Sequence, residues 1–278
     1  MRPIPYDPGS EALLHPGRRE TLFKRGATYS LEQLGAECAR LAYIDPTGPE
    51  LPRLEEALDR VGFGQLALFN AQGTGTEGFG AVHRSDKRVV IAFRGTEPDK
   101  LSDLVTDVFF LPEDWPESAG QVHRGFAEAL RSVLPAVTTW LDQVRGDRAL
   151  LLCGHSLGAA LATLAASVWP GSDLVTLGSP RVGNEVFVRS LRTASSVRFV
   201  DCCDVVTHLP PALPWSTHVD TEVYIDSSGN LHRQGGDFSS DQMNARAAFL
   251  LAHSFADGSA RARDFADHAP INYLRALF

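Results

Sequence analysis

The chain has 278 residues and a net charge of −8, and 44% of its residues are hydrophobic. This composition allows a substantial core and argues against disorder. Since Lys and Arg form no run, nucleic acid is a poor partner, and no stretch approaches the roughly 18 apolar residues of a membrane-spanning helix.

The start of the chain, residues 1–29, predicts an irregular N-terminal arm, because it is rich in Pro, Gly and charge. Its first twenty residues contain no apolar h-region, so we find no secretory signal. Two of the four cysteines, Cys202 and Cys203, are adjacent, which makes a poor disulfide framework. We therefore expect a cytoplasmic location, with signal-independent export left open. Without C-x-x-C or H-E-x-x-H, we expect no zinc site.

The next segments predict two helices and then antiparallel strands. Residues 30–45 have a helical apolar pattern, and Ser30 with Gln33 forms a capping-box start. A second short helix is predicted over 51–63. Further on, short β-rich runs are separated by turn residues, which favours antiparallel pairing. These runs are 66–72, 78–85 and 87–93.

From residue 124 onward, predicted helices and strands alternate. This alternation implies right-handed crossovers and a largely parallel sheet within one domain. A hairpin around Ser-Ser-Gly-Asn and an alanine-rich helical segment complete the chain. The expected elements are helices at 124–144 and 157–168, strands at 149–153, 173–178 and 197–201, the hairpin within 217–233, and the helical segment 241–266.

One short stretch, "LLCGHSLGAALATLAA" at 151–166, places Ser156 between Gly154 and Gly158. It is either a tight structural turn or a nucleophile elbow, in which a buried strand, Gly-x-Ser-x-Gly and a helix follow one another. Glycines leave room where the strand and the helix pass closely. The helix that follows would direct its first amides at developing negative charge, which favours the catalytic interpretation.

Five segments in one order resemble class 3 lipases, the fungal-lipase-like α/β-hydrolases. They are "VIAFRGT" (90–96), "VHRGFAEAL" (122–130), "GHSLGAALATL" (154–164), "VTLGSPRVGN" (175–184) and "DVVTHLP" (204–210). The resemblance runs from about residue 30 to the end of the chain. It implies an α/β-hydrolase fold over 30–278, with a mostly parallel central sheet flanked by helices, and a serine ester hydrolase that needs no metal or organic cofactor.

A serine nucleophile needs a base, and the base needs an acid to orient it. α/β-Hydrolases order them as Ser, acid, His. Asp204, which begins a segment resembling that of the family's acid, is preferred over Asp201. "DHAPINYL" at 267–274 resembles the family's C-terminal base segment, so His268 is the predicted base. Four other histidines follow Ser156: His208, His218, His232 and His253. His208 directly follows the acid segment and cannot easily be the distal base. His218 is expected to be structural or to lie just outside the site, and His253 to be a partly buried helix residue.

Two N–H groups should meet the oxyanion. One is that of Leu157, directly after the nucleophile. By resemblance, Thr96 supplies the other and also its hydroxyl. Arg94 and His123 are expected to be structural, Arg94 by anchoring its loop and His123 by packing.

Two segments bear on substrate access. Residues 97–121 are either a short amphipathic lid, as in fungal lipases, or an ordinary helix on the core. Residues 209–216 form either an acyl-pocket wall or a rigid crossover loop. The resemblance implies a triacylglycerol or another acyl ester as substrate, with transient contact to a lipid interface. Phospholipase A1, feruloyl esterase and acyltransferase activities stay open, as does an inert lipase-like interaction protein.

Overall fold

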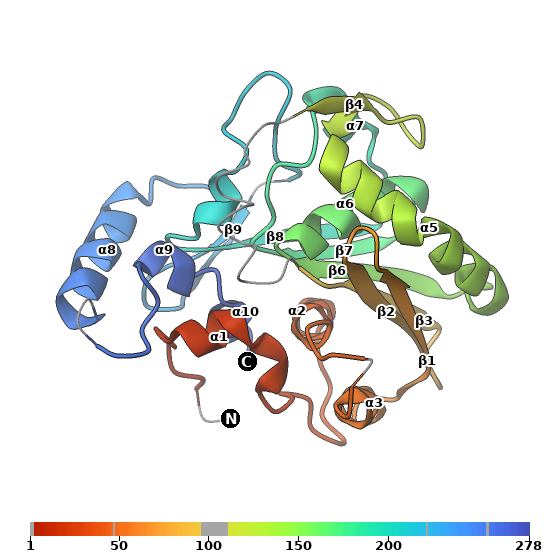
Figure 1. Ribbon diagram of the computed structural model, residues 1–278, viewed down its shortest axis with the longest axis horizontal. Helices are drawn as coiled ribbons and strands as arrows, with labels where there is room; N and C mark the ends of the chain where they lie inside the picture. Colours follow the sequence, from red (N-terminus) through yellow and green to blue (C-terminus); the bar gives the residue numbers. More distant parts are fainter. Residues whose placement is uncertain (1–2, 47, 96–110, 221, 254–255) are drawn as a thin grey trace.

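The computed structural model describes residues 3–46, 48–95, 111–220, 222–253 and 256–278. In this part of the chain, eight strands form one sheet in the order β1-β2-β3-β6-β7-β8-β9-β10, with helices on both faces (Figure 1). The centre of the sheet is parallel, from β3 to β9. The predicted α/β-hydrolase architecture is confirmed.

The strands follow the predicted pattern closely. The first three pair antiparallel, and β10 returns antiparallel to β9 as the second arm of the predicted hairpin. A separate antiparallel pair, β4 and β5, precedes α5. The bounds are β1 Phe63–Ala71, β2 Thr76–His83, β3 Arg88–Phe93, β4 Pro112–Asp114, β5 Gln121–His123, β6 Ala149–His155, β7 Asp173–Leu177, β8 Ser195–Asp201, β9 Glu222–Ile225 and β10 Leu231–His232.

Two apolar layers sandwich the sheet. Helices α2 (Leu31–Leu41), α3 (Leu51–Asp59) and α10 (Pro270–Leu274) cover one face, and α5 (Arg124–Val144) and α6 (Leu157–Val168) cover the other (Figure 1). Helix α2 begins at the predicted capping box, with Ser30 Oγ accepting from the Gln33 N–H and the Gln33 side chain accepting from the Ser30 N–H. Small alanines let α6 lie close against the strands, and its residues from Gly158 to Ser167 are buried.

The N-terminal arm contains two short helical segments, α1 (Ser10–Leu14) and the 3-10 turn η1 (Pro16–Arg18). Before them, the Tyr6 hydroxyl donates to Asp267 (2.8 Å), and the Asp7 N–H donates to Asn272 (2.9 Å). The arm is therefore attached to the C-terminal segment by polar contacts. The predicted domain boundary between residues 29 and 30 stays a prediction.

In the part of the chain that the structure describes, the predicted helical segment 241–266 is helical only at its two ends. Helix α8 (Ser239–His253) ends, and the separate helix α9 (Arg263–Ala266) begins ten residues later. Gly258 between them has φ +79°, a left-handed conformation that cannot continue an α-helix. The other helices of the described residues are α7 (Glu185–Ser190) and the 3-10 turn η3 (Val205–His208). Among the described residues, no helix has the length and apolarity needed to cross a membrane.

Candidate active site

Ser156 lies at the sharp turn from β6 into α6, with φ 58° and ψ −128°. A non-glycine residue adopts this region at a cost and is held there by its surroundings. The two flanking glycines are required by sterics. A Cβ on Gly154 would lie 2.1 Å from the Gly158 carbonyl oxygen, and one on Gly158 would lie 2.1 Å from that of Phe93. The predicted strand, turn and helix are thus confirmed.

The Ser156 hydroxyl is buried, and its Oγ has no hydrogen-bond partner among the described residues. The Leu157 N–H belongs to the first turn of α6, whose N–H groups have no acceptor within the helix. Thr96 lies outside the described residues, but Gly95 before it is described. A Cβ on Gly95 would come 3.1 Å from Ser156 Cβ. The loop leading to Thr96 therefore passes directly beside Ser156.

Asp204 and His268 meet at the carboxyl edge of the sheet. His268 Nδ1 lies 2.8 Å from Asp204 Oδ2, and both side chains are buried. The same oxygen accepts from the Tyr273 hydroxyl (2.5 Å), and Oδ1 accepts from the Val206 N–H (2.8 Å). Since every hydrogen bond to this carboxylate favours its charged form, Asp204 is suited to orient an imidazole and balance its positive charge.

His268 and Ser156 share neighbours. His155, next to Ser156, bonds through Nε2 to the His268 carbonyl oxygen (2.8 Å). The Ser156 N–H donates to Leu177 O (3.0 Å), and a Cβ on the following Gly178 would lie 3.1 Å from His268 Nδ1. Within the described part of the chain, His268 Nε2, like Ser156 Oγ, has no hydrogen-bond partner. Unpaired buried polar atoms are costly, and two of them in side chains that share neighbours suit a proton transfer that substrate completes.

His155 is held in one tautomer. Burial, followed by the nearby His268, lowers the pKa of His155 well below its usual range, so the ring is neutral. Its Nε2–H donates to the His268 carbonyl, and Nδ1 therefore accepts from the Tyr43 hydroxyl (2.7 Å). Sequence reasoning missed both residues. His155 is the variable position of Gly-x-Ser-x-Gly, and Tyr43 stands in no motif.

The competing acid lies elsewhere. Asp201 ends β8 fully buried, and neither of its carboxylate oxygens has a hydrogen bond to a residue that the structure describes, although Arg275 lies 3.7 Å away. Burial and the nearby Asp267 raise the pKa of Asp201 well above its usual range. The structure thus pairs His268 with Asp204 and not with Asp201.

The other histidines after Ser156 lie in different surroundings. His218 bonds to Thr207 O (2.8 Å), and His232 pairs with Asp226 (2.9 Å). His253 contacts Phe249 at the end of α8, and His208 lies in η3. The contacts of His218 and His253 agree with the roles expected for these two residues.

Two residues near the site have the expected structural roles. Arg94 forms an ion pair with Glu77 (2.6 Å). His123 caps α5 by accepting from the Gly125 N–H and stacks on Phe126, and burial lowers its pKa. Of the proposed lid, residues 97–110 lie outside the described part of the chain. The acyl-pocket role of 209–216, where Leu213 and Trp215 are exposed, stays a prediction.

Comparison with known proteins gives several matches. Residues 90–213 match the family model of lipase (class 3). A lipase of Rhizomucor miehei is 32% identical over 156 residues, which cover 51% of this chain and 42% of the relative. The secreted mono- and diacylglycerol lipase A of Penicillium camembertii is 32% identical, covering 56% and 54%. The chloroplastic phospholipase A(1) DAD1 of Arabidopsis thaliana is 34% identical, covering 44% and 33%. The chain thus spans about half the length of the curated relatives it matches.

Solved structures agree on the fold. The triacylglyceride lipase of Rhizomucor miehei has a TM-score of 0.63 at 23% identity, covering 88% of this chain and 95% of that one. The lipase of Rhizopus microsporus var. chinensis has a TM-score of 0.57 at 26% identity, covering 70% and 73%. Together with the turn at Ser156, this fold defines an α/β-hydrolase. Within that class, residues 90–213 are similar to the class 3 lipase family, as the motifs indicated.

The predicted cytoplasmic location is wrong. The matching fungal relatives point to an extracellular protein, and those of Penicillium camembertii and Fusarium solani are named as secreted lipases. The cysteine pattern was a poor guide, because all four thiols are buried. Thiols shielded from solvent can stay unpaired without a reducing compartment.

Proposed function

We propose that this protein is a serine carboxylic-ester hydrolase of the lipase or esterase type, with Ser156, His268 and Asp204 as its catalytic triad. The observation that carries the proposal is the buried His268–Asp204 pair (2.8 Å) beside a strained serine. The free Nε2 of that imidazole and the free Oγ of Ser156 are the two atoms between which a proton would pass.

The reaction has two steps. Ser156 Oγ attacks the ester carbonyl carbon, and His268 Nε2 takes the hydroxyl proton while Asp204 holds Nδ1–H. The N–H groups of Leu157 and Thr96 bind the oxyanion. His268 then returns the proton to the leaving alcohol. A water, deprotonated by the same nitrogen, attacks the acyl-enzyme, and the proton passes to Ser156 as the acid leaves.

The substrate class is a neutral acyl ester, with transient docking at a lipid interface. The names of the fungal relatives favour mono-, di- or triacylglycerols. The plant relative is named a phospholipase A(1), which supports phospholipid as the second candidate. Hydrolysis of diacylglycerol vesicles compared with phosphatidylcholine vesicles separates the two. Added alcohol identifies acyl transfer through an ester product.

The test uses Ser156→Ala with Ser172→Ala as matched control, because the Ser172 hydroxyl is also buried without a partner. We expect Ser156→Ala to lower kcat on p-nitrophenyl butyrate by on the order of 10⁴-fold or more and to abolish fluorophosphonate labelling. Ser172→Ala should keep both. Labelling or full turnover in Ser156→Ala would contradict the proposal, and a wild-type protein that does not react would be an inert relative of lipases.

A further inference from the structure

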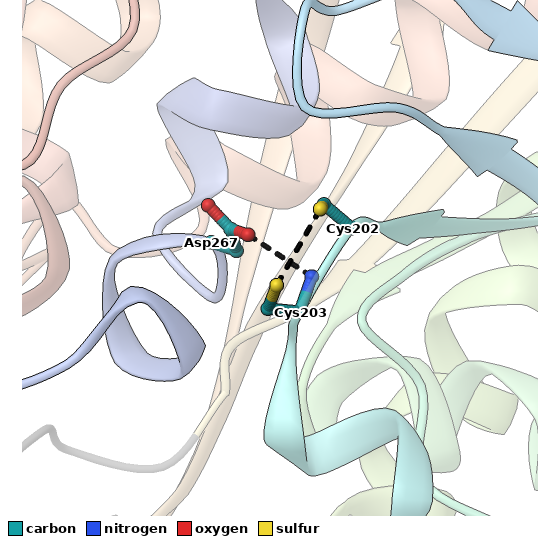
Figure 2. A group of neighbouring side chains, drawn as sticks. All are labelled: Cys202, Cys203 and Asp267. Carbon is teal, nitrogen blue, oxygen red and sulfur yellow. Dashed lines mark hydrogen bonds between the residues drawn. The ribbon is translucent and has the colours of Figure 1, made fainter. Parts of the chain in front are cut away.

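Two adjacent thiols lie directly before the proposed catalytic acid. Cys202 and Cys203 follow β8, and their Sγ atoms are 3.4 Å apart (Figure 2). The turn that holds them is closed by the Asp204 N–H, which donates to Asp201 O (2.8 Å). Cys202 has φ 25°, an unusual value for a residue with a side chain. The turn therefore brings two sulfurs together at the base of the active site.

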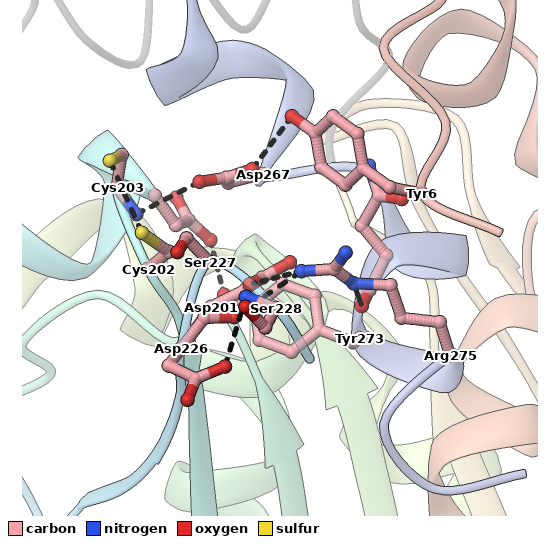
Figure 3. Close-up of polar contacts among 12 residues, drawn as sticks. Tyr6, Asp201, Cys202, Cys203, Asp226, Ser227, Ser228, Asp267, Tyr273 and Arg275 are labelled. Atoms are coloured by element: carbon pink, nitrogen blue, oxygen red, sulfur yellow. Dashed lines mark hydrogen bonds and ion pairs between the residues drawn. The ribbon is translucent and has the colours of Figure 1, made fainter. Parts of the chain in front are cut away.

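Asp267 completes a group of three side chains whose ligand atoms lie within 4.8 Å of one another. Its carboxylate, however, accepts from the Tyr6 hydroxyl (2.8 Å) and the Cys203 N–H (3.0 Å) (Figure 3). It also accepts from Arg263 Nε (2.7 and 2.9 Å). The guanidinium of Arg263 already supplies the positive charge. A metal ion here would be repelled by that charge, and the Asp267 carboxylate, already bound to Arg263, would be a poor ligand for it. The reaction that remains open to the two sulfurs is their own oxidation.

We propose that Cys202 and Cys203 are an oxidation site that closes to a disulfide between adjacent residues and thereby lowers the activity of the triad. The effect on activity rests on the proposed function, whereas the modification does not. With hydrogen peroxide as oxidant, one S–S bond forms and the O–O bond breaks. The two sulfurs are oxidised, and the peroxide is reduced to two waters, which take up both thiol protons.

The two sulfur atoms are covered by the first turn of α8. The Cys202 thiol lies against Asp241 Oδ2 and the Cys203 thiol against Gln242 O, both at 3.5 Å on the first turn of α8. Of the fifteen residues of α8, only Ala245 and Phe249 are buried. The first turns of α8 are held mainly by polar contacts, such as Asp241 with the Tyr224 hydroxyl (2.9 Å) and Arg246 with Asp264 (2.9 Å). Local opening of such a segment exchanges these contacts for water and admits a small neutral oxidant. The two remaining thiols are more deeply enclosed: Cys38 lies in α2 against the sheet, and Cys153 lies in the central strand β6.

The turn is connected to both partners of the proposed acid–base pair. Asp204 follows Cys203 in the chain, and the Cys203 N–H donates to Asp267, the residue before His268. Closing the sulfurs from 3.4 Å to the roughly 2.05 Å of a disulfide rotates the peptide that carries this N–H. Displacements of this size near a catalytic group cost up to about 100-fold in rate. We therefore expect kcat/KM of the oxidised form to fall by on the order of 10-fold to 100-fold.

The modification is read by mass, independently of activity. After treatment with hydrogen peroxide, the protein is unfolded, alkylated with iodoacetamide and digested with trypsin. Cleavage after Arg and Lys gives peptide 199–233, which contains both adjacent cysteines, whereas 26–40 and 149–181 contain one cysteine each. We expect 199–233 to escape alkylation and to be lighter by two hydrogen atoms, and the other two peptides to be alkylated. Alkylation or added oxygen on 199–233 would overturn the proposed site.

Activity is measured on the same samples before and after dithiothreitol. We expect the loss to reverse in the wild type and to be absent in Cys202→Ser and Cys203→Ser, each compared with its own reduced form. Cys38→Ser serves as the control and should respond like the wild type. A disulfide with unchanged turnover would overturn the connection to the triad. If the reduced protein hydrolyses no ester, the proposed function fails, while the peptide masses still decide the oxidation site.

Discussion

The two sides of the proposed active site are built in different ways. Ser156 is positioned by backbone sterics within a few residues, since Gly154 and Gly158 allow β6 to turn into a fully packed α6. His268 lies between the short helices α9 and α10 and is held by polar groups from distant parts of the chain, notably Asp204 and His155. A Cβ added at Gly154 or Gly158 should therefore prevent folding, whereas damage to the histidine side should lower turnover in a folded protein.

Among substitutions on the histidine side of the site, the largest loss of turnover is expected for Gly178→Ala. A Cβ here would lie 2.7 Å from Asp204 Oδ2 and 3.1 Å from both His268 Nδ1 and the Tyr273 hydroxyl oxygen. It would push the acid and the base apart, and we expect kcat/KM on a p-nitrophenyl ester to fall by on the order of 100-fold.

Gly171→Ala is the matched control for backbone strain. Gly171 also has a positive φ (78°, against 58° at Gly178), but a Cβ there meets nothing within 4 Å. It should cost about 1 kcal/mol in the free energy of unfolding and leave turnover unchanged. Equal turnover in the two variants would show that the space beside Gly178 is unimportant.

A smaller effect is expected for Tyr273→Phe, which removes the 2.5 Å hydrogen bond to Asp204 and little volume. Hydrogen bonds to a charged acceptor contribute about 1.5–3 kcal/mol, so we expect kcat to fall about 10-fold. KM should be unchanged, because the Tyr273 hydroxyl bonds to Asp204 and is not expected to contact the substrate.

The control for Tyr273→Phe is Tyr29→Phe. The Tyr29 hydroxyl bonds only to backbone groups near the N-terminus, namely Lys24 N–H and Leu22 O. This variant should keep its kcat. A Tyr273→Phe protein with wild-type kcat would show that Val206 N–H alone holds the carboxylate well enough.

The same contrast explains what the sequence could predict. Periodicity and turn residues were enough for the strands, for α2 with its cap, and for the turn at Ser156, because each depends on neighbouring residues. The pairing of Asp204 with His268 spans 64 residues and came from the family resemblance, which the geometry matches. Tyr43 and His155 were missed because their importance arises only when α2, β6 and the His268 segment meet.

Tyr43→Phe tests one of these missed contacts. It would leave Nδ1 of the buried His155 without its donor, which costs about 1–3 kcal/mol in the free energy of unfolding. Because the hydroxyl reaches His268 only through His155, the fall in kcat should be about 3-fold, smaller than in Tyr273→Phe. Denaturant unfolding and steady-state kinetics measure the two effects. Unchanged stability would mean that water replaces the hydroxyl.

The smallest effect at neutral pH is expected for His218→Gln. This substitution should change the pH dependence of the free energy of unfolding and leave turnover unchanged. Burial, together with the charges of Arg198 and Arg181, lowers the pKa of His218 to about 3. In the unfolded chain it would titrate near 6.5, so the unfolded state binds the extra proton below that pH. The folded protein therefore loses up to about 1.4 kcal/mol of stability per pH unit from this residue as the pH falls from about 6.5 towards 3.

Gln keeps a donor for Thr207 O but cannot take up a proton, so the variant should lose stability less steeply in acid than the wild type. His155, with its lowered pKa, adds a slope of the same sign to both proteins, and Asp201, with its raised pKa, adds one of opposite sign above about pH 3.8. Both contributions cancel when the free energies of unfolding of the two proteins are subtracted. Urea unfolding near pH 7 and pH 5 measures this difference between wild type and His218→Gln. If the free energy of unfolding changes equally with pH in the two proteins, His218 gains its proton without unfolding. Ester turnover near pH 7 should be equal in the two proteins, because His218 belongs to neither side of the site.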